Sequence, residues 1–352
     1  MRVANKIMDQ TETLPVQNAV LGLKKELNEA LSLYWKSASE ILHGSGIRVL
    51  DPVPEYFSIK RNFFSLLFLY SYFRAGIAKP RRVLYATINQ CLRGMVTGCD
   101  NILDDEYKKT LETDLPEQAT RFRSILDIMA SDRVLFSILY RGYRENMLSP
   151  DMVLEACSES LRFLAESGVQ EASEEGGVEE ILKPEIVLSS VHHYKTARLF
   201  QCPWAVPTII EKNEAENVSV IKEALYQIGM GCQILDDMVD LSMDLRMNRH
   251  NYVASLISHG ANPEERDLLK AGQLLKKGLE DRSDLLMEFP DAMQTAGAKA
   301  LSYLKNGARA LFDDQHQSMV DVSVVLIAAQ IGADKFLLNT EGYDPNATRF
   351  LD

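Results

Sequence analysis

The sequence predicts an all-α protein that folds as one large helical domain over residues 1–352. Apolar residues recur at spacings of three and four, which is the period of a helix with one buried face, and β-branched runs are few. Glycine (19 residues) and proline (12) are sparse and cluster in short breaks between these stretches. No shift of composition marks a second domain, so we expect one domain, helical from about residue 15 to 338.

The breaks place the helices in chain order. The first helix carries the stripe Ala19, Leu23, Leu27 and Leu31 and ends at His43–Gly46. The apolar segment 63–73 is too short to span a bilayer, so we expect a buried helix there. The later breaks are at Lys79-Pro80, Leu115-Pro116, Ser149-Pro150, Cys202-Pro203 and Gly260–Pro263. Three segments are expected to lie outside helices: the ends 1–15 and 342–352, and an acidic surface loop at 170–180.

Composition and charge exclude several classes of protein. With 50 acidic and 38 basic residues the net charge is −12, so the chain has no overall basic footprint for nucleic acid. The N-terminus lacks the apolar core of a secretory signal, and no segment is long enough to cross a membrane. Five scattered cysteines form no metal-binding pattern and are expected to be core residues in a reducing cytoplasm (Cys91, Cys99, Cys157, Cys202, Cys232).

Two clusters of aspartates lie in otherwise apolar helical stretches. In the first, Asp100 and Asp104 share a helix face, and in the second Asp236, Asp240 and Asp244 do so. Like charges at this spacing destabilise an isolated helix by about 0.2–0.5 kcal/mol per pair, so such stripes need a counter-charge. Mg²⁺ held by carboxylates, waters and substrate phosphates supplies one, and the sequence has no pattern that suits zinc.

These features together resemble the trans-prenyl diphosphate synthase (polyprenyl synthetase) family of class I isoprenoid enzymes. That family has two Asp-Asp-x-x-Asp motifs on facing helices, with a Lys-Thr pair between them. Here the second motif is QILDDMVD, which contains Gln233 and Asp236, and the pair is Lys195-Thr196. The segment ending in Lys60-Arg61 is similar to the Gly-Lys-Arg segment that binds the diphosphate of the homoallylic co-substrate. The resemblance implies a helical bundle around a central apolar cavity.

The first motif departs from the family pattern. In one register it begins at Asp100, and Asn101 replaces the second aspartate; in the other it begins at Asp104 and ends at Lys108. We prefer the first register, which puts Lys109 where the family has an Arg-Arg pair. Lysine is a point charge and lacks the two-pronged guanidinium of arginine, so the replacement matters at a phosphate. After the second motif, Arg246 or Arg249 could supply the missing cation.

The resemblance assigns roles to these positions. It implies that Lys195, Thr196 and Gln233 belong to the catalytic machinery, and that Mg²⁺, three ions per active site, is held by carboxylates. The implied metal ligands are Asp100, Asp104, Asp236 and Asp240, with Asp105 and Asp237 as further candidates. The implied diphosphate-binding residues are Lys60, Arg61, Lys109, Lys195, Arg246 and Arg249. A homodimer is expected from the resemblance alone.

The expected activity is ionisation of an allylic prenyl diphosphate. Three hypotheses about the function of the protein follow. In the leading hypothesis the carbocation is attacked by isopentenyl diphosphate, which elongates the prenyl chain. In the second, a terpene synthase or a transferase to another acceptor uses the cation without this co-substrate. In the third, the chain is a non-catalytic subunit of a prenyl synthase. Small residues ahead of the first motif, Val96 to Cys99, suggest room for a chain of about 15 carbons or more.

Overall fold

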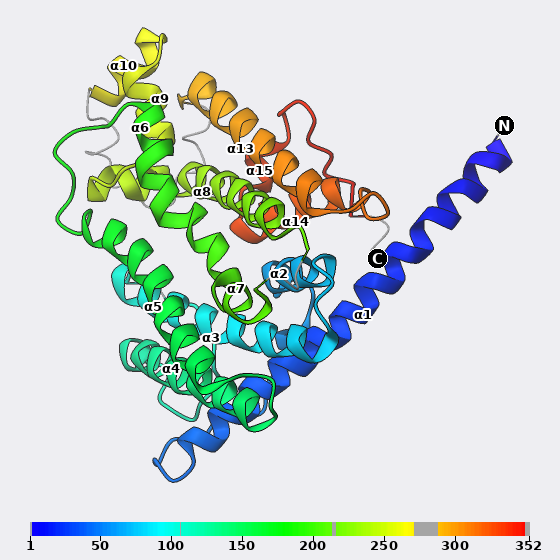
Figure 1. Cartoon of the computed structure of the whole chain (residues 1–352). Coiled ribbons are helices and arrows are strands. Elements are labelled where there is room, and N and C mark those ends of the chain that lie inside the picture. Colours follow the sequence, from blue (N-terminus) through cyan, green and yellow to red (C-terminus); the bar gives the residue numbers. More distant parts are fainter. Residues whose placement is uncertain (1, 106, 213–215, 271–287, 349–352) are drawn as a thin grey trace. The chain divides into compact units, whose positions relative to one another are not determined.

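The structure is a computed structural model that describes residues 2–105, 107–212, 216–270 and 288–348. Within these ranges the regular secondary structure is helical, apart from one isolated bridge between Val49 and Thr113, so the all-α prediction is confirmed (Figure 1). The helices are α1 (Arg2–Leu42), η1 (Pro54–Phe57), α2 (Phe63–Arg74), α3 (Lys79–Leu103), α4 (Thr120–Arg144), α5 (Pro150–Ala172), α6 (Pro184–Ile186), η2 (Val187–Ala197), η3 (Leu199–Trp204), α7 (Ala205–Glu211), α8 (Val218–Met247), α9 (Tyr252–His259), α10 (Pro263–Lys270), α13 (Pro290–Leu311), α14 (Met319–Ile331) and α15 (Asp334–Leu337).

The chain forms two compact units, and each is described by itself. Unit 1 comprises Met1–Arg162 and Pro203–Val218, and unit 2 comprises Phe163–Cys202 and Ser219–Asp352. The boundaries fall within helices: Phe163 lies in α5, and Pro203 lies in the short 3₁₀ helix η3. The expectation of one domain around a central apolar cavity stays a prediction.

In unit 1, α3 and α4 lie side by side, and two glycines let them approach closely (Figure 1). A Cβ atom at Gly98 would lie 2.7 Å from Cγ1 of Ile128 and 2.8 Å from the carbonyl oxygen of Ser124, both on α4. Gly94 meets Ser131 of α4 in the same way. The small residue at position 98 therefore serves helix packing, and it no longer supports the expectation of space for a long prenyl chain.

The apolar segment expected to be a buried helix is α2, and that prediction is confirmed. Most of its side chains are buried, and Tyr72 is fully enclosed. The Tyr72 hydroxyl accepts a hydrogen bond from Asn89 of α3 (2.8 Å) and donates one to the carbonyl of Pro203 (2.6 Å). The indole of Trp204 donates to Ser71 at 2.9 Å. These bonds tie α2 to α3 and to the segment that precedes α7.

In unit 2, α8 packs closely against α13. A Cβ atom at Gly307 would lie 2.7 Å from the carbonyl oxygen of Ala224, and one at Gly231 would lie 2.6 Å from Cγ of Leu304. Helix α13 also packs on α14 and α9. The second aspartate cluster is on α8, so this contact holds its backbone in a rigid part of the unit.

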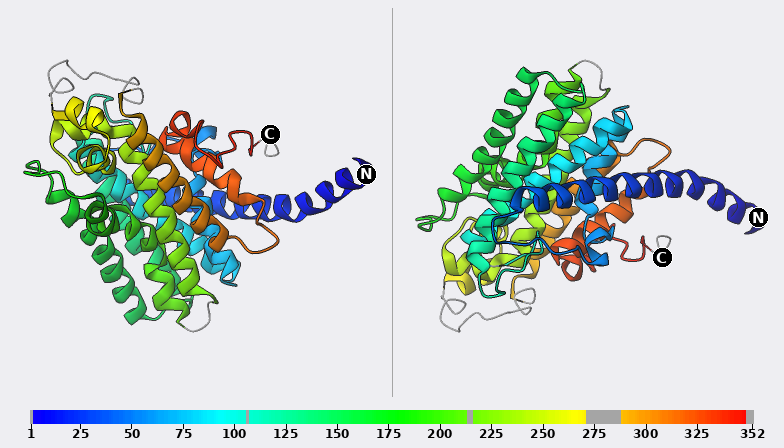
Figure 2. Two further views of the ribbon diagram at one scale, coloured as in Figure 1. Left: turned by 90° about the horizontal axis from the view of Figure 1, so that it is seen from above. Right: turned by 90° about the horizontal axis from the view of Figure 1, so that it is seen from below.

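Several predicted boundaries agree with the structure and others differ. Breaks at His43–Gly46, Lys79-Pro80, Ser149-Pro150 and 260–263 coincide with helix ends. However, α1 begins at Arg2, where the sequence predicts an irregular segment, and Figure 2 shows it in blue as one continuous helix. Pro15 alone did not interrupt it. Residues 342–348 form turns, as predicted, and residues 349–352 lie outside the described ranges.

Two further expectations from the sequence concern the cysteines and the apolar helices. Cys91, Cys202 and Cys232 are buried as expected, but Cys99 is exposed and Cys157 is half-buried. None of the helices in the described ranges is both long and apolar enough to cross a membrane.

The acidic segment 170–180 packs against the turn that follows α8, which differs from the expected solvated loop. Its first residues, to Ala172, continue α5. Glu174 is only 2% exposed and accepts hydrogen bonds from the side chain of Gln170 and the backbone N–H of His250, both at 2.9 Å. The N–H of Val178 donates to the carbonyl of Asn248 at 2.7 Å. Glutamates therefore line the inner side of this segment as well as its surface.

Candidate functional site

The first aspartate cluster lies at the C-terminal end of α3 in unit 1. Asp100 is on the helix, which ends at Leu103, and the backbone N–H of Asp104 caps it by donating to the carbonyl of Asp100 at 2.9 Å. Asp105 has a positive φ of 52° and is exposed, 3.4 Å from Arg121. The register that begins at Asp100 therefore follows the helix, whereas the register from Asp104 to Lys108 runs past its end.

Asn101, the residue that departs from the family pattern, is buried and binds a neighbouring loop. Its Oδ1 accepts a hydrogen bond from the N–H of Lys108 (2.8 Å), and its Nδ2 donates to the carbonyl of the same residue (3.1 Å). Nδ2 also lies 3.3 Å from Oγ of Ser124 on α4. The oxygen and the nitrogen of this amide are thus both engaged with protein groups, which does not support a role as a metal ligand.

Two basic segments predicted for the co-substrate lie next to each other in unit 1. Nη2 of Arg61 donates a hydrogen bond to the carbonyl of Lys109 at 2.9 Å. Lys60, Lys108 and Lys109 are exposed, and Nζ of Lys109 lies 3.1 Å from a carboxylate oxygen of Glu112. We call Lys60, Arg61, Lys108 and Lys109 the basic cluster.

In unit 2, the Lys-Thr pair lies on η2, an 11-residue π-helix. The N–H of Arg198 donates to the carbonyl of His193, five residues back, as the wider helix requires. Thr196 donates a hydrogen bond to Oε1 of Gln233, and Nε2 of Gln233 donates to Oδ2 of Asp236 at 3.4 Å. The structure therefore joins the Lys-Thr element directly to the second aspartate motif. Segments with π-helical bonds frequently occur at functional sites.

Asp237 is a buried anchor of this network. It is 2% exposed, and its carboxylate accepts hydrogen bonds from Gln233 (2.9 Å), from His192 (2.8 Å) and from the N–H of Tyr252. Burial by itself would raise the pKa of Asp237, but these partners, His192 above all, hold it below its usual range. Both oxygens are engaged, so these contacts do not support the assignment of Asp237 as a metal ligand. Asp236 and Asp240 are partly exposed.

Lys195 is surrounded by four carboxylates, of which the sequence did not single out Glu171 and Glu174. Its Nζ lies 3.2 Å from Glu171, and its side chain is 18% exposed. Burial by itself lowers the pKa of Lys195, but Glu171, Asp244, Asp237 and Glu174 together raise it above its usual value. The ammonium group is therefore charged at every physiological pH. Glu171 comes from the acidic segment, and no spacing in the sequence could link it to a lysine on another helix.

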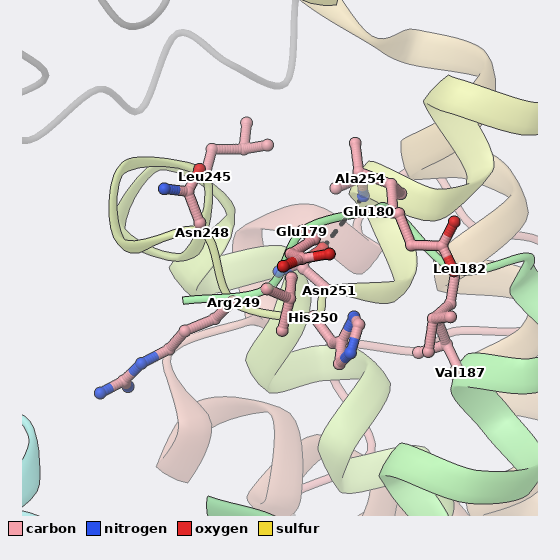
Figure 3. A pocket seen from close by; sticks show the side chains of 12 residues that line it. Glu179, Glu180, Leu182, Val187, Leu245, Asn248, Arg249, His250, Asn251 and Ala254 are labelled. Atoms are coloured by element: carbon pink, nitrogen blue, oxygen red, sulfur yellow. Dashed lines mark hydrogen bonds between the residues drawn. The ribbon is translucent and has the colours of Figure 1, made fainter. Parts of the chain in front are cut away.

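The residues after the second motif are arranged around a small cavity of about 120 Å³ in unit 2. Asp244, the last residue of the aspartate stripe, is buried, and burial together with Asp237 raises its pKa to about 8. Arg246 is exposed on the last turn of α8. Figure 3 shows Arg249 at this cavity with its guanidinium group pointing away from the other labelled side chains.

The carboxylates on α8 have the chemistry that suits magnesium. Asp236 and Asp240 lie one turn apart and offer partly exposed oxygen ligands. Among the residues that the structure describes, no three His, Cys, Asp or Glu side chains form a metal-binding group. Mg²⁺ usually takes only one or two protein carboxylates and completes its shell with water and substrate phosphates, so these residues fit it.

Comparisons with known proteins agree with this fold, with the Lys-Thr pair and with the second aspartate motif. Residues 123–252 match the sequence model of a family described as polyprenyl synthetase, and no curated protein matches significantly. A decaprenyl diphosphate synthase from Rhodobacter capsulatus has a similar structure: the TM-score is 0.60 at 15% identity, over 89% of this chain and 98% of that one. A geranylgeranyl pyrophosphate synthetase from Pyrococcus horikoshii Ot3 gives 0.55 at 15% identity, over 89% and 99%. A polyprenyl synthase from Caulobacter crescentus CB15, complexed with calcium and isoprenyl diphosphate, gives 0.57 at 12% identity, over 93% and 96%.

The chain thus has the helical fold of the isoprenoid synthases. Over residues 123–252, which include the Lys-Thr pair and the second aspartate motif, it carries the sequence features of the polyprenyl synthetases, a family of prenyltransferases. The family resemblance and the enzyme class predicted from the sequence are confirmed.

Proposed function

We propose that this protein elongates an allylic prenyl diphosphate with isopentenyl diphosphate in a Mg²⁺-dependent reaction. The observation that carries this proposal is the hydrogen bond of 2.9 Å between Arg61 and the carbonyl of Lys109. It brings two basic segments from distant parts of the sequence into one basic cluster. Elongation needs a second diphosphate site, whereas a terpene synthase needs none, so this cluster favours elongation.

The residues of the aspartate motifs bind the allylic substrate in this proposal. Asp100 and Asp104 of the first motif, and Asp236 and Asp240 of the second, would be ligands of Mg²⁺. Bound Mg²⁺ would neutralise the diphosphate and stabilise it as a leaving group. Lys195, Thr196 and either Arg246 or Arg249 bind its remaining oxygens. The raised pKa of Lys195 supports this role, because a permanent positive charge is needed beside a diphosphate.

The reaction needs no protein nucleophile. The bond between C1 of the allylic chain and the diphosphate oxygen breaks, and the electron pair leaves with the diphosphate. The double bond of isopentenyl diphosphate then attacks C1, which moves the positive charge onto the isopentenyl unit. A carbon next to this new cation loses a proton to the released diphosphate, and a new double bond forms. In this proposal the basic cluster binds the diphosphate of the co-substrate.

The test is incubation with Mg²⁺ and geranyl, farnesyl or geranylgeranyl diphosphate, each with and without isopentenyl diphosphate. We expect longer prenyl diphosphates only when isopentenyl diphosphate is present. A variant for this test is Lys109→Ala. It should raise the KM for isopentenyl diphosphate and leave the KM for the allylic substrate unchanged. A hydrocarbon or an alcohol formed without isopentenyl diphosphate would instead identify a terpene synthase. No diphosphate release from any substrate would point to a non-catalytic subunit.

We also propose a homodimer and a cytoplasmic location. An apolar stripe on α4 supports the dimer, because its side chains are exposed and recur at spacings of three, four and seven, as at a helix–helix seam. The stripe comprises Phe122, Ile125, Met129, Phe136, Tyr140 and Tyr143. Sedimentation equilibrium should give twice the chain mass of 39.6 kDa, and a monomer at micromolar concentration would contradict the dimer. Five free thiols are consistent with a reducing cytoplasm.

A further inference from the structure

The residue that breaks the first aspartate motif has its own task in this structure. Asn101 is 4% exposed and forms hydrogen bonds with both backbone groups of Lys108. A side-chain amide can do this because it carries one acceptor oxygen and two N–H donors, like a peptide group. A carboxylate of the same size has no donor, so it would face the carbonyl of Lys108 with a negative charge.

The loop that Asn101 holds carries two residues of the basic cluster. Arg61 binds the carbonyl of Lys109 from the other side at 2.9 Å. Further along, the guanidinium of Arg123, which is 5% exposed, donates from Nε to the carbonyl of Pro116 at 3.0 Å and from Nη2 to that of Leu115. The segment between Lys108 and Pro116 is therefore fixed at both ends by side chains from α3 and α4.

We propose that Asn101 is a positioning residue: its amide fixes the backbone of Lys108 so that Lys108 and Lys109 are held ready for the diphosphate of isopentenyl diphosphate. This inference rests on the proposed function for the identity of the ligand. The hydrogen bonds by which Asn101 holds Lys108 do not depend on that function. At this position of the motif, an amide that binds the backbone therefore stands where the family pattern has a carboxylate. It is not a metal ligand that has been lost.

The Asn101→Asp variant separates these two explanations. If Asn101 positions the loop, the variant should raise the KM for isopentenyl diphosphate about tenfold, since it loses two donated hydrogen bonds, while kcat and the KM for the allylic substrate stay within about twofold. If the position is a weakened metal site, the restored carboxylate should raise kcat or lower the Mg²⁺ concentration required, and that result would overturn the proposal. An equal loss toward both substrates would also contradict it.

A second measurement needs no substrate. Trypsin cleaves after Lys108 and Lys109, so the initial rate of cleavage there reports how firmly the loop is held. We expect Asn101→Asp and Asn101→Ala to be cleaved at least fivefold faster at these sites than the wild type, with cleavage elsewhere unchanged. Equal cleavage rates of variants and wild type would refute the proposal that Asn101 holds this loop. Asn101→Ala introduces no buried charge, so it covers the case in which the aspartate variant does not fold.

The matched control is Ser124→Ala. It removes the 3.3 Å contact of Asn101 Nδ2 and leaves both bonds to Lys108 in place, so cleavage and KM should stay within about twofold. If the wild-type enzyme does not consume isopentenyl diphosphate at all, the proposed function fails, while the cleavage rates still decide whether Asn101 holds the loop.

Discussion

Replacing Asp236 by alanine should lower kcat by about 100- to 1000-fold, the range found when one group that stabilises developing charge is removed. Asp236 is partly exposed at the start of the second motif, and Gln233 binds one of its oxygens at 3.4 Å. In the proposed function this carboxylate is a ligand of the Mg²⁺ that neutralises the leaving diphosphate, and the variant lacks it. Single-turnover rates at saturating allylic diphosphate, measured over a range of Mg²⁺ concentrations, test this.

Two control variants separate the metal from the hydrogen-bond network. Asp236→Asn keeps a partner for Gln233 but removes the charge, so it should be impaired nearly as much as Asp236→Ala. Asp267→Ala removes an exposed carboxylate from α10, far along the chain from both motifs, and should leave kcat unchanged. A kcat for Asp236→Ala within tenfold of wild type would refute the assignment of Asp236 to the metal.

Replacing His192 by alanine should lower the free energy of unfolding by about 3–5 kcal/mol, because the buried carboxylate of Asp237 loses the partner that contributes most to its lowered pKa. His192 is 1% exposed, and its Nε2 lies 2.8 Å from Oδ2 of Asp237. Urea denaturation at pH 7 measures the change. The matched control is His193→Ala, the next residue, whose ring bonds the hydroxyl of Tyr226 at a half-buried position and whose loss should cost about 1 kcal/mol.

The effect of His192→Ala should depend on pH. The folded-state pKa of Asp237 lies below its usual value, so the stabilisation from its ionised form is present above about pH 4. It is lost as the pH falls through the folded-state pKa and the carboxylate gains a proton. The difference between wild type and His192→Ala should therefore be largest near neutral pH and shrink in acid; a difference that grows in acid would contradict the assignment.

The sequence predicted the fold where local signals dominate. The breaks at Gly44 and Gly46, which have positive φ, and the prolines at the starts of α3 and α5 mark helix ends, because their backbone preferences decide the local structure. The prediction from the sequence failed where tertiary contacts decide the local structure. The acidic segment looks solvated by composition, yet Glu174 is buried by the turn after α8, and no period in the sequence records that contact.

The same distinction holds for the candidate site. The pairing of Thr196 with Gln233 and the nearness of Arg61 to Lys109 agree with motifs found from residue type and order. The roles of Asp237 and Asn101 could not be found in this way, because motif spacing does not tell an inward-facing side chain from one that faces a substrate. Burial and hydrogen-bond partners separate the two, and both arise from the packed structure.

The hydrogen bonds that link η2 to α8 have a consequence for any quantitative study of this enzyme. Thr196, Gln233, Asp237 and His192 share partners in one chain of contacts, so removing one of them changes what the others can bind. Energies of such neighbours do not add, and differences of 0.5–3 kcal/mol between summed and measured effects are common. The cost of one substitution here is a property of the whole set, and double-mutant cycles are the measurement that can divide it among the four side chains.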